Sequence, residues 1–355
     1  MLRRSRRRSA ALVVTVGTLV ATLAACGDTG GDDASTIVRT TTNVAGAGVV
    51  GIERDTVGLC ALPQPADAFG RQGDGRIVVG SGRTVTVPAD PQRIVVLSME
   101  ALDASCAVGT WERVVGAPTV PLAPTAPPSA LPRPDYLGTG IARIAPVGPP
   151  SAPDVEAIRA LAPDVIVGTD ELDPAVRDEL DAIAPTVLTR TESSWTDRAL
   201  LAATAMGRRE AASRAVDDYR ARAEDVGLRL NSRLTEASVI RFHGDGADVL
   251  GDDSFAGQVL TAAGVRRPGP QQGPTAPLPA DDLSVAEGDL IYVIFDGPDG
   301  LENGRSVMES DAWKDLGAAT DGRVFAVDDA AWSGNGVIAA RTVLTDLENS
   351  LNGYV

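Results

Sequence analysis

The sequence predicts an α/β protein of two parallel-sheet lobes joined by one long helix. In residues 209–234 apolar side chains recur every three or four positions, which places them on one stripe of an α-helix. Short alternations of strand and helix, which build separate parallel-sheet lobes, precede and follow this run. A chain of 355 residues has room for two such lobes. The stripe consists of Ala212, Val216, Tyr219, Ala223, Val226, Leu230 and Leu234.

The predicted helix would be about 39 Å long, which is more than the width of a small domain. A helix of this length between two α/β halves indicates a strut, and a strut implies a cleft between the lobes. The alternative interpretation is an ordinary long surface helix.

Residues 1–25 are predicted to be a lipoprotein signal peptide. Five arginines precede an apolar segment, residues 10–23, that is too short to span a bilayer. The run Leu23-Ala24-Ala25-Cys26 resembles the bacterial lipobox. This resemblance implies cleavage before Cys26 and lipidation of its thiol, and it leaves acylation of the new amino group open. The protein is then anchored by lipid at the extracytoplasmic face of the cell membrane. A plain secretory signal is the alternative.

The charge of the chain argues against a nucleic-acid partner. The net charge is −16, and removal of the five arginines of the signal peptide takes it to −21. Such a surface repels nucleic acid, and no basic stripe compensates.

For the oligomeric state of the protein, a monomer is expected.

The cysteine count predicts one disulfide. With Cys26 used by lipid, Cys60 and Cys106 remain as an even pair in an oxidising compartment. Their bond would tie the leader to the first helix of the core, with about 4 kcal/mol of stabilisation in the chain-entropy model.

Residues 26–75 are predicted to be a flexible tether because Gly, Thr, Ser and Asp occur there without a sustained period. Residues 46–51 match G-x-G-x-x-G, but a dinucleotide site needs a following helix, and Pro63 and Pro65 come soon after. We interpret the match as a coincidence.

The N-terminal lobe is predicted to span residues 76–194. Residues 76–79 and 84–87 flank Gly80-Ser81-Gly82 as a β-hairpin, and 91–98 is a continuous apolar strand. Strands are also predicted at 114–116, 163–168 and 186–189, with helices at 99–108, 154–161 and 175–183. Residues 117–150 contain ten prolines and are predicted to be irregular.

Residues 195–235 are predicted to contain a short helix, 195–206, and then the interlobe helix. The C-terminal lobe, 236–355, repeats the alternation. Its predicted strands are 237–242, 290–295 and 323–327, and its predicted helices are 255–263 and 336–351.

Several stretches resemble the ferric-siderophore receptors of the periplasmic-binding fold. They are residues 91–98, 154–168, 206–210, 254–260 and 310–332. The chain resembles the FecB- and FhuD-like substrate-binding lipoproteins of ABC importers over about residues 75–353, and the leader from Thr40 onward suggests their actinobacterial group. The resemblance implies two Rossmann-like lobes joined by a single long rigid helix (class III), with the ligand between them and little hinge motion.

Ligands of open α/β sheets bind outside the carboxyl ends of the strands, so the loops there supply the candidate contacts. Arg241 could pair with a carboxylate or hydroxamate oxygen, and aromatic side chains could stack on a chelate or macrocycle. Packing and helix capping are the alternative roles for several of these residues. The candidate set is Met99, Glu100, Tyr136, Thr169, Asp170, Trp195, Arg241, His243, Phe255, Asp296 and Trp332.

Direct metal capture is not expected. His243 is the only histidine, whereas metal-importer binding proteins need several histidines and carboxylates. Iron would arrive inside a siderophore, and no cofactor is bound directly. Haem, with His243 or Tyr136 as axial ligand, and cobalamin are the alternatives. A serine hydrolase built from His243 and residues 251–254 is less favoured, because Ser254 lacks a nucleophile elbow.

The resemblance also implies docking to the membrane subunits of an ABC importer. In the family an acidic residue on each lobe contacts an arginine of the importer. The matching positions are Glu156, before the strand at 163–168, and Asp281, before the strand at 290–295. Asp281 departs from the family's usual glutamate. First-turn acids that complement helix dipoles are the alternative interpretation.

Overall fold

A computed structural model describes residues 40–44, 47–51, 60–68, 70–72, 76–80, 82–119 and 134–351. Cys26 and the signal peptide lie outside the described residues. Both lobes belong to one compact unit, residues 37–355.

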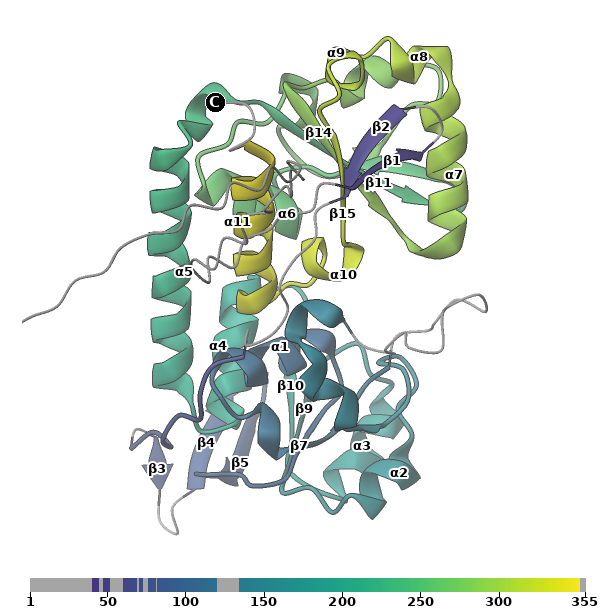
Figure 1. Cartoon of the computed structure of the whole chain (residues 1–355). Helices are drawn as coiled ribbons and strands as arrows, with labels where there is room; N and C mark the ends of the chain where they lie inside the picture. The colour runs from purple at the N-terminus through teal and green to yellow at the C-terminus, as the bar shows by residue number, and fades with distance from the viewer. Residues whose placement is uncertain are drawn as a thin grey trace, which may run out of the picture. The chain divides into compact units, whose positions relative to one another are not determined.

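The N-terminal lobe is built on a five-stranded parallel sheet in the order β10-β9-β6-β7-β8 (Figure 1). Four of its strands are largely buried and mostly apolar, which is the pattern of a sheet covered on both faces, whereas the edge strand β8 is half-buried at Ala145 and exposed at Pro146. They are β6 (Ile94–Val96), β7 (Val114–Ala117), β8 (Ala145–Pro146), β9 (Val165–Thr169) and β10 (Thr186–Thr189). The predicted strands are confirmed.

Helices cover this sheet, and each begins at a capping side chain. Ser98 accepts a hydrogen bond from the backbone N–H of Ala101, and Asp154 and Asp173 cap the next two helices in the same way. The helices are α1 (Met99–Ala107), α2 (Val155–Ala160) and α3 (Pro174–Asp181). A small antiparallel sheet of β3 (Arg71–Gln72), β4 (Arg76–Gly80) and β5 (Thr84–Pro88) contains the predicted hairpin.

The part of the proline-rich stretch that the structure describes after residue 133 is more regular than predicted. It contains the 3₁₀ helices η2 (Asp135–Leu137) and η3 (Thr139–Arg143) and the strand β8. Proline is tolerated in β8 because this strand lies at the edge of the sheet, where the missing N–H of Pro146 costs no ladder hydrogen bond. A further 3₁₀ turn, η1 (Trp111–Arg113), precedes β7.

The C-terminal lobe has a seven-stranded mixed sheet in the order β1-β2-β15-β14-β11-β12-β13. Its parallel centre is formed by the predicted strands β11 (Ala237–His243), β14 (Leu290–Phe295) and β15 (Val324–Val327). Strands β12 (Gly246–Val249) and β13 (Ala276–Pro277) extend it antiparallel, and neither was predicted.

Helices on both faces complete the C-terminal lobe. They are α6 (Phe255–Ala262), α7 (Gly297–Glu309), α8 (Asp311–Lys314), α9 (Gly317–Thr320), α10 (Asp329–Trp332) and α11 (Val337–Leu351). The 3₁₀ turns η5 (Gly269–Gln271) and η6 (Leu283–Ala286) lie in the connection before β14. Sequence reasoning missed α7, because its glycines lower the helix propensity.

The interlobe helix is α5 (Arg209–Arg229), which follows α4 (Trp195–Ala205). Its predicted apolar stripe is buried from Ala212 to Leu230. The helix ends earlier than predicted because Asn231 has φ 50°, a left-handed conformation that asparagine tolerates, and the 3₁₀ turn η4 (Ser232–Leu234) follows. Leu234 is 80 % exposed, so the prediction that it belongs to the stripe is wrong.

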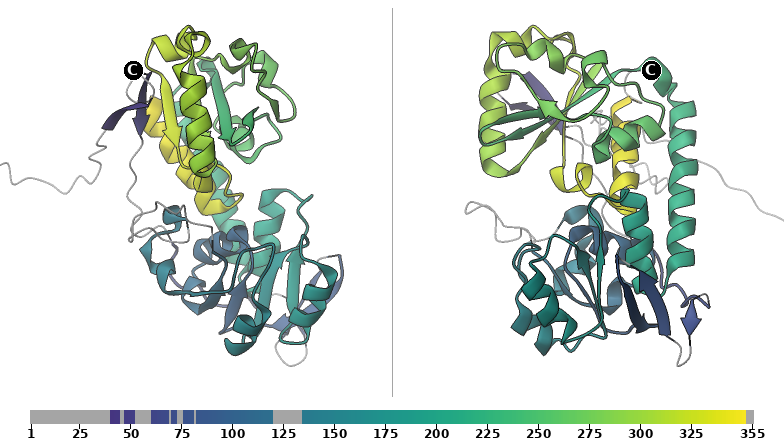
Figure 2. Two further views of the ribbon diagram at one scale, coloured as in Figure 1. Left: turned by 90° about the vertical axis from the view of Figure 1, so that its right-hand side faces the viewer. Right: turned by 180° about the vertical axis from the view of Figure 1, so that it is seen from behind.

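Helix α11 runs alongside α5 and also reaches the N-terminal lobe, where it packs against α1 (Figure 2). Two helices, α5 and α11, therefore connect the lobes. The chain passes from the N-terminal to the C-terminal lobe through α5, and it changes lobe once before, because Gly51 pairs in the C-lobe sheet and Cys60 is bonded to the N-terminal lobe. Two contacts between α5 and α11 are ion pairs of Arg222 and Arg229 with Glu348.

The prediction of a flexible tether over residues 26–75 is wrong for three segments, one of which is the strand β3 described above. Strands β1 (Thr40–Val44) and β2 (Ala47–Gly51) form an antiparallel hairpin, and β2 pairs parallel with β15 (Figure 1). Threonine and valine favour extended backbone, and the edge of β15 offers unpaired backbone groups. The glycine run thus contributes a strand and no phosphate loop.

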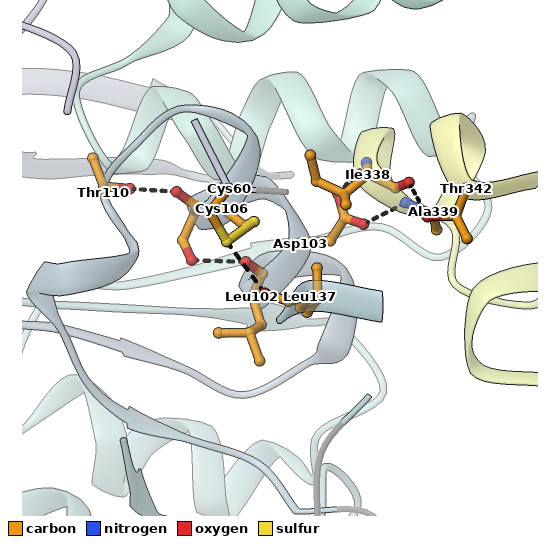
Figure 3. The surroundings of a disulfide bond; sticks show 10 residues. Cys60, Leu102, Asp103, Cys106, Thr110, Leu137, Ile338, Ala339 and Thr342 are labelled. Atoms are coloured by element: carbon orange, nitrogen blue, oxygen red, sulfur yellow. Dashed lines mark hydrogen bonds between the residues drawn. A yellow bond between two sulfur atoms is a disulfide. The ribbon is translucent and has the colours of Figure 1, made fainter. Parts of the chain in front are cut away.

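The second ordered leader segment, residues 60–68, lies on the N-terminal lobe. The structure contains the expected disulfide between Cys60 and Cys106, with a Cα–Cα distance of 4.5 Å (Figure 3). Farther along, the carboxylate of Asp67 accepts a hydrogen bond from the N–H of Glu210, in the first turn of α5. The Nε of the buried Arg208 donates to the carbonyl of Gln64. The leader therefore caps the interlobe helix.

Candidate functional site

The carboxyl ends of the parallel strands carry most of the proposed ligand contacts. In the N-terminal lobe the loops after β6, β9 and β10 begin at Leu97, Asp170 and Arg190. In the C-terminal lobe β11 ends at His243, and the loops after β14 and β15 begin at Asp296 and Asp328. We call these two groups of loops the N-lobe edge and the C-lobe edge.

The two edges come close together near Tyr136, because a Cβ placed on Gly334 of the C-terminal lobe would lie 3.0 Å from the hydroxyl oxygen of Tyr136. Burial raises the pKa of Tyr136 well above its usual value, and the negative charges of Asp103, Asp328 and Glu100 raise it further. Glu100 follows β6 in the N-terminal lobe, whereas Asp328 follows β15 in the C-terminal lobe. Both edges therefore lie within electrostatic range of one buried side chain.

At the N-lobe edge Glu100 forms a bidentate ion pair with Arg198 of α4. Nε and Nη2 of Arg198 donate to the two carboxylate oxygens at 3.0 and 2.9 Å. Burial raises the pKa of Glu100, and the neighbouring Arg198 opposes the rise. Nη1 of Arg198 donates to the carbonyl oxygens of Thr191 and Ser193 at 2.9 and 2.6 Å. Sequence reasoning missed Arg198, whose one signal is its position as a lone cation in an alanine-rich helix.

At the C-lobe edge Arg241 is held by two aspartates. Its Nε and Nη2 donate to the carboxylate of Asp329 at 2.9 and 3.1 Å, and Nη2 lies 3.2 Å from Oδ2 of Asp296. Hydrogen bonding to Asp329 is the largest cause of the raised pKa of Arg241. Ser333 also donates to Asp329, at 2.9 Å. Asp329 is a second residue that sequence reasoning missed.

His243 lies where β11 turns back into β12. Its Nδ1 is 2.7 Å from Oδ1 of Asp245, and its Nε2 is 3.7 Å from Oδ2 of Asp248. The hydrogen bond with His243 is the main cause of the lowered pKa of Asp245. The amide of Asn303, on α7, fixes the turn by donating to the carbonyl oxygens of His243 and Gly246 at 2.8 and 2.6 Å.

Asp170 joins the loops after β9 and β10. Its Oδ1 accepts hydrogen bonds from the backbone N–H and the hydroxyl of Thr191 at 3.1 and 3.2 Å. Thr169 is half-buried at the end of β9, and Met99 is half-buried and packs against the core at the start of α1. Asp296 is exposed.

The four aromatic candidates are buried, which corrects the prediction that they contact ligand. Tyr136 and Trp332 are fully buried, and Trp195 and Phe255 are 5 and 6 % exposed. Trp195 packs edge-on against Tyr219 and Phe255, with ring centroids 5.3 and 5.5 Å away. Trp332 donates from Nε1 to Asp346 at 2.7 Å. These rings fill the core between helices and strands, so we withdraw them from the ligand set.

The lobes are joined at Asp103, a fully buried residue of α1 (Figure 3). Its two carboxylate oxygens accept hydrogen bonds from the backbone N–H groups of Ile338 and Ala339, at 3.0 and 2.9 Å. These groups belong to the first turn of α11, where the helix dipole favours a negative charge. Burial raises the pKa of Asp103 to about 6, although the hydrogen bonds oppose the rise.

The pKa of Asp103 predicts a pH dependence of stability. The folded pKa of about 6 exceeds the unfolded value of 3.8, so the folded chain takes up a proton between these values. Below pH 4 this proton contributes its whole share to the free energy of unfolding. That share, about 3 kcal/mol at most, is lost as the pH rises through 6. Urea unfolding of wild type and Asp103→Asn from pH 4 to 7 should show the wild type losing stability relative to the variant. A constant difference would contradict the prediction.

Within the described residues no cluster of three or more His, Cys, Asp or Glu side chains is arranged to hold a metal ion. No helix of the described part is long and apolar enough to cross a membrane.

Two α/β lobes joined through a long helix, with charged loops at the carboxyl ends of their strands, define a two-lobed substrate-binding protein. The chain belongs to the periplasmic binding protein family, whose model matches residues 94–331. Its family and relatives are binding proteins of transport systems and not enzymes.

Individual relatives agree with the family. The probable siderophore-binding lipoprotein YfiY of Bacillus subtilis is 30 % identical over 287 residues, which cover 75 % of this chain and 84 % of YfiY. The structure of Staphylococcus aureus SirA in complex with staphyloferrin B is 24 % identical, with a TM-score of 0.65 and coverage of 78 % of this chain and 98 % of SirA. FhuD of S. pseudintermedius is 17 % identical, with a TM-score of 0.60 over 78 % of this chain and 98 % of FhuD. These structures share the fold.

Proposed function

We propose that this protein is an extracytoplasmic lipoprotein that captures a ferric siderophore between its lobes and delivers it to an ABC importer. The observation that carries the proposal is the similarity to YfiY, a protein named for siderophore binding, over three quarters of the chain. The approach of the two edges at Tyr136 and Gly334 supports a position for the ligand between the lobes. The proposed contacts are Met99, Glu100, Thr169, Asp170, Arg241, His243 and Asp296.

The location follows from the leader. Cys26 is proposed to carry the lipid, since it follows a charged segment, an apolar segment and the run Leu-Ala-Ala. Glu156 and Asp281 are proposed to dock on the membrane subunits of the importer, and both are exposed.

Iron is proposed to enter inside its chelator, which supplies the metal ligands. Cobalamin and haem remain alternative ligands. For haem, His243 remains a possible axial ligand, whereas the hydroxyl of Tyr136 is buried. The hydrolase hypothesis is dropped, because Ser254 caps α6: its hydroxyl donates to the carbonyl of Gly251 and accepts from the N–H of Gly257.

A fluorescence titration tests the proposed function. Purified protein is titrated with a ferric hydroxamate, a ferric catecholate, a carboxylated mycobactin-type chelate, haem and cobalamin. At least one ferric siderophore should quench tryptophan fluorescence saturably, because chelates that absorb light quench nearby tryptophans. The same siderophore without iron is the control and should bind more weakly. Saturation by haem or cobalamin alone would replace the proposed ligand, and no saturation by any compound would overturn the function.

A further inference from the structure

The charge of Arg241 is already compensated within the protein. Asp329 binds two nitrogens of its guanidinium group, Nε and Nη2, and Oδ2 of Asp296 lies 3.2 Å from Nη2. An anionic ligand would have to compete with Asp329 for these donors. Nη1 has no hydrogen bond among the described residues, so Arg241 can still donate to a neutral oxygen. The residue therefore offers donors without offering net positive charge.

Arg198 at the other edge is engaged in the same way. Its Nε and Nη2 bind the two oxygens of Glu100, and its Nη1 binds two carbonyl oxygens. Its side chain is only 10 % exposed. All three nitrogens of this arginine are engaged within the N-terminal lobe, so few of its N–H donors are left for an anionic ligand.

Acidic side chains dominate the rest of both edges. Asp170 and Glu171 follow β9 and Asp245 follows β11, all three exposed. Among the described residues of these loops, Arg190 is a cation without an acidic partner, and it lies exposed after β10. One such cation does not balance the surrounding acids, so a ligand with a net negative charge would be repelled.

We propose that the ligand is a ferric chelate with a neutral or positive net charge, and that Asp329 determines this specificity by compensating Arg241. The inference rests on the proposed function and narrows it to one class of siderophore. Neutral and cationic ferric trihydroxamates have this charge and present hydroxamate and carbonyl oxygens to the remaining donors of Arg241. Anionic citrate-type and catecholate chelates are excluded by the same charges.

The test compares wild type with Asp329→Asn. Binding of ferrioxamine B (cationic), ferrichrome (neutral), ferric citrate and ferric enterobactin (both anionic) is measured by fluorescence titration at low and physiological salt. Wild type should bind a trihydroxamate at least tenfold more tightly than either anionic chelate. Asp329→Asn should raise the affinity for an anionic chelate at least tenfold, because it frees the guanidinium of Arg241. Adding Arg241→Gln to this variant should abolish the gain.

Asp299→Asn is the matched control. Asp299 lies exposed in the first turn of α7, at the same edge, and makes no contact with Arg241. If Asp329→Asn and Asp299→Asn gain the same affinity for an anionic chelate, general charge repulsion explains the selectivity. That result would overturn the role proposed for Asp329. Preference of wild type for an anionic chelate overturns the charge inference but leaves siderophore capture intact. Binding of no chelate in either this or the wider panel overturns the proposed function itself. Thermal melts show whether each variant is folded; if Asp329→Asn is not, Asp329→Ser, which also removes the charge, takes its place.

Discussion

Replacement of Asp103 by alanine is expected to lower the free energy of unfolding at pH 7.5, by at most about 3 kcal/mol. The substitution leaves the N–H groups of Ile338 and Ala339 without acceptors in the interior, and each buried unsatisfied group costs about 1–3 kcal/mol. Loss of the buried charge offsets part of this cost. Urea denaturation followed by circular dichroism measures the change.

Two further measurements make this prediction specific to the lobe junction. Asp245→Ala removes an aspartate whose side chain is 97 % exposed, and it should leave the free energy of unfolding nearly unchanged. Hydrogen exchange should accelerate first at the amides of Ile338 and Ala339 in Asp103→Ala. Equal stability of the two variants, or unchanged exchange in the first turn of α11, would show that Asp103 does not hold the lobes together.

Charge reversal at Glu156 is expected to reduce siderophore uptake at least tenfold while ligand affinity stays unchanged. Glu156 lies in the first turn of α2, its side chain is 83 % exposed, and its one ion pair is a long contact of 3.4 Å with Arg159. It is therefore free to meet an arginine of the importer. Loss of one partner of a charge pair that becomes buried on docking costs about 2–5 kcal/mol.

The structure places Asp281 in the corresponding part of the C-terminal lobe. It is exposed just before η6, which precedes β14 as α2 precedes β9, and β9 and β14 each pair with the preceding central strand. Reversal at Asp281 should have the smaller effect, because aspartate reaches less far than glutamate.

The uptake experiment has a matched control in Glu179→Arg. Glu179 is exposed on α3, the neighbour of α2, so this variant makes the same charge change on the same lobe. Uptake of labelled iron chelate is measured in cells, and affinity is measured on the purified variants. Normal uptake by Glu156→Arg, or a parallel loss of ligand affinity, would contradict a docking role.

Local patterns in the sequence predicted the central fold. The strands β6, β9, β11 and β14 are short apolar runs, and burial on both faces requires that composition. The stripe of α5 was predicted as far as Leu230, because its periodicity of 3.6 residues is imposed by packing on one face. These elements depend on neighbours close in sequence.

The missed elements depend on partners far away in sequence. Strand β2 exists because β15, some 275 positions later, offers it an edge, and no local pattern in Ala47–Gly51 indicates that edge. Helix α7 contains Gly297, Gly300 and Gly304; Gly300 and Gly304 lie against Phe242, so closely that a Cβ at Gly300 would meet the carbonyl oxygen of Phe242 at 2.4 Å. Close packing thus outweighs the helix propensity of the glycines.

The position of the candidate site was predicted, but several of its residues were not. These residues, too, depend on partners far away in sequence. Strand order tells which loops lie at the carboxyl ends, but it does not tell which way a side chain points. Trp195 follows a carboxyl-end loop and nevertheless turns into the core against Phe255. The ion pairs of Arg198 and Arg241 join residues 98 and 88 positions apart, which no periodicity reveals.

The hairpin β1–β2 changes the distance that the two lobes can reach from the membrane anchor. With a lipid at Cys26, as proposed, about 14 residues separate the anchor from the first strand, instead of about 34 for a free segment up to the disulfide at Cys60. A flexible chain of these lengths has a root-mean-square span of about 20 Å or about 32 Å. Confinement to the smaller volume raises the local concentration of the protein roughly fourfold at an importer in the same membrane. The added strands thus shorten the linker between the lipid anchor and the lobes. A loaded molecule therefore searches a smaller volume for its importer.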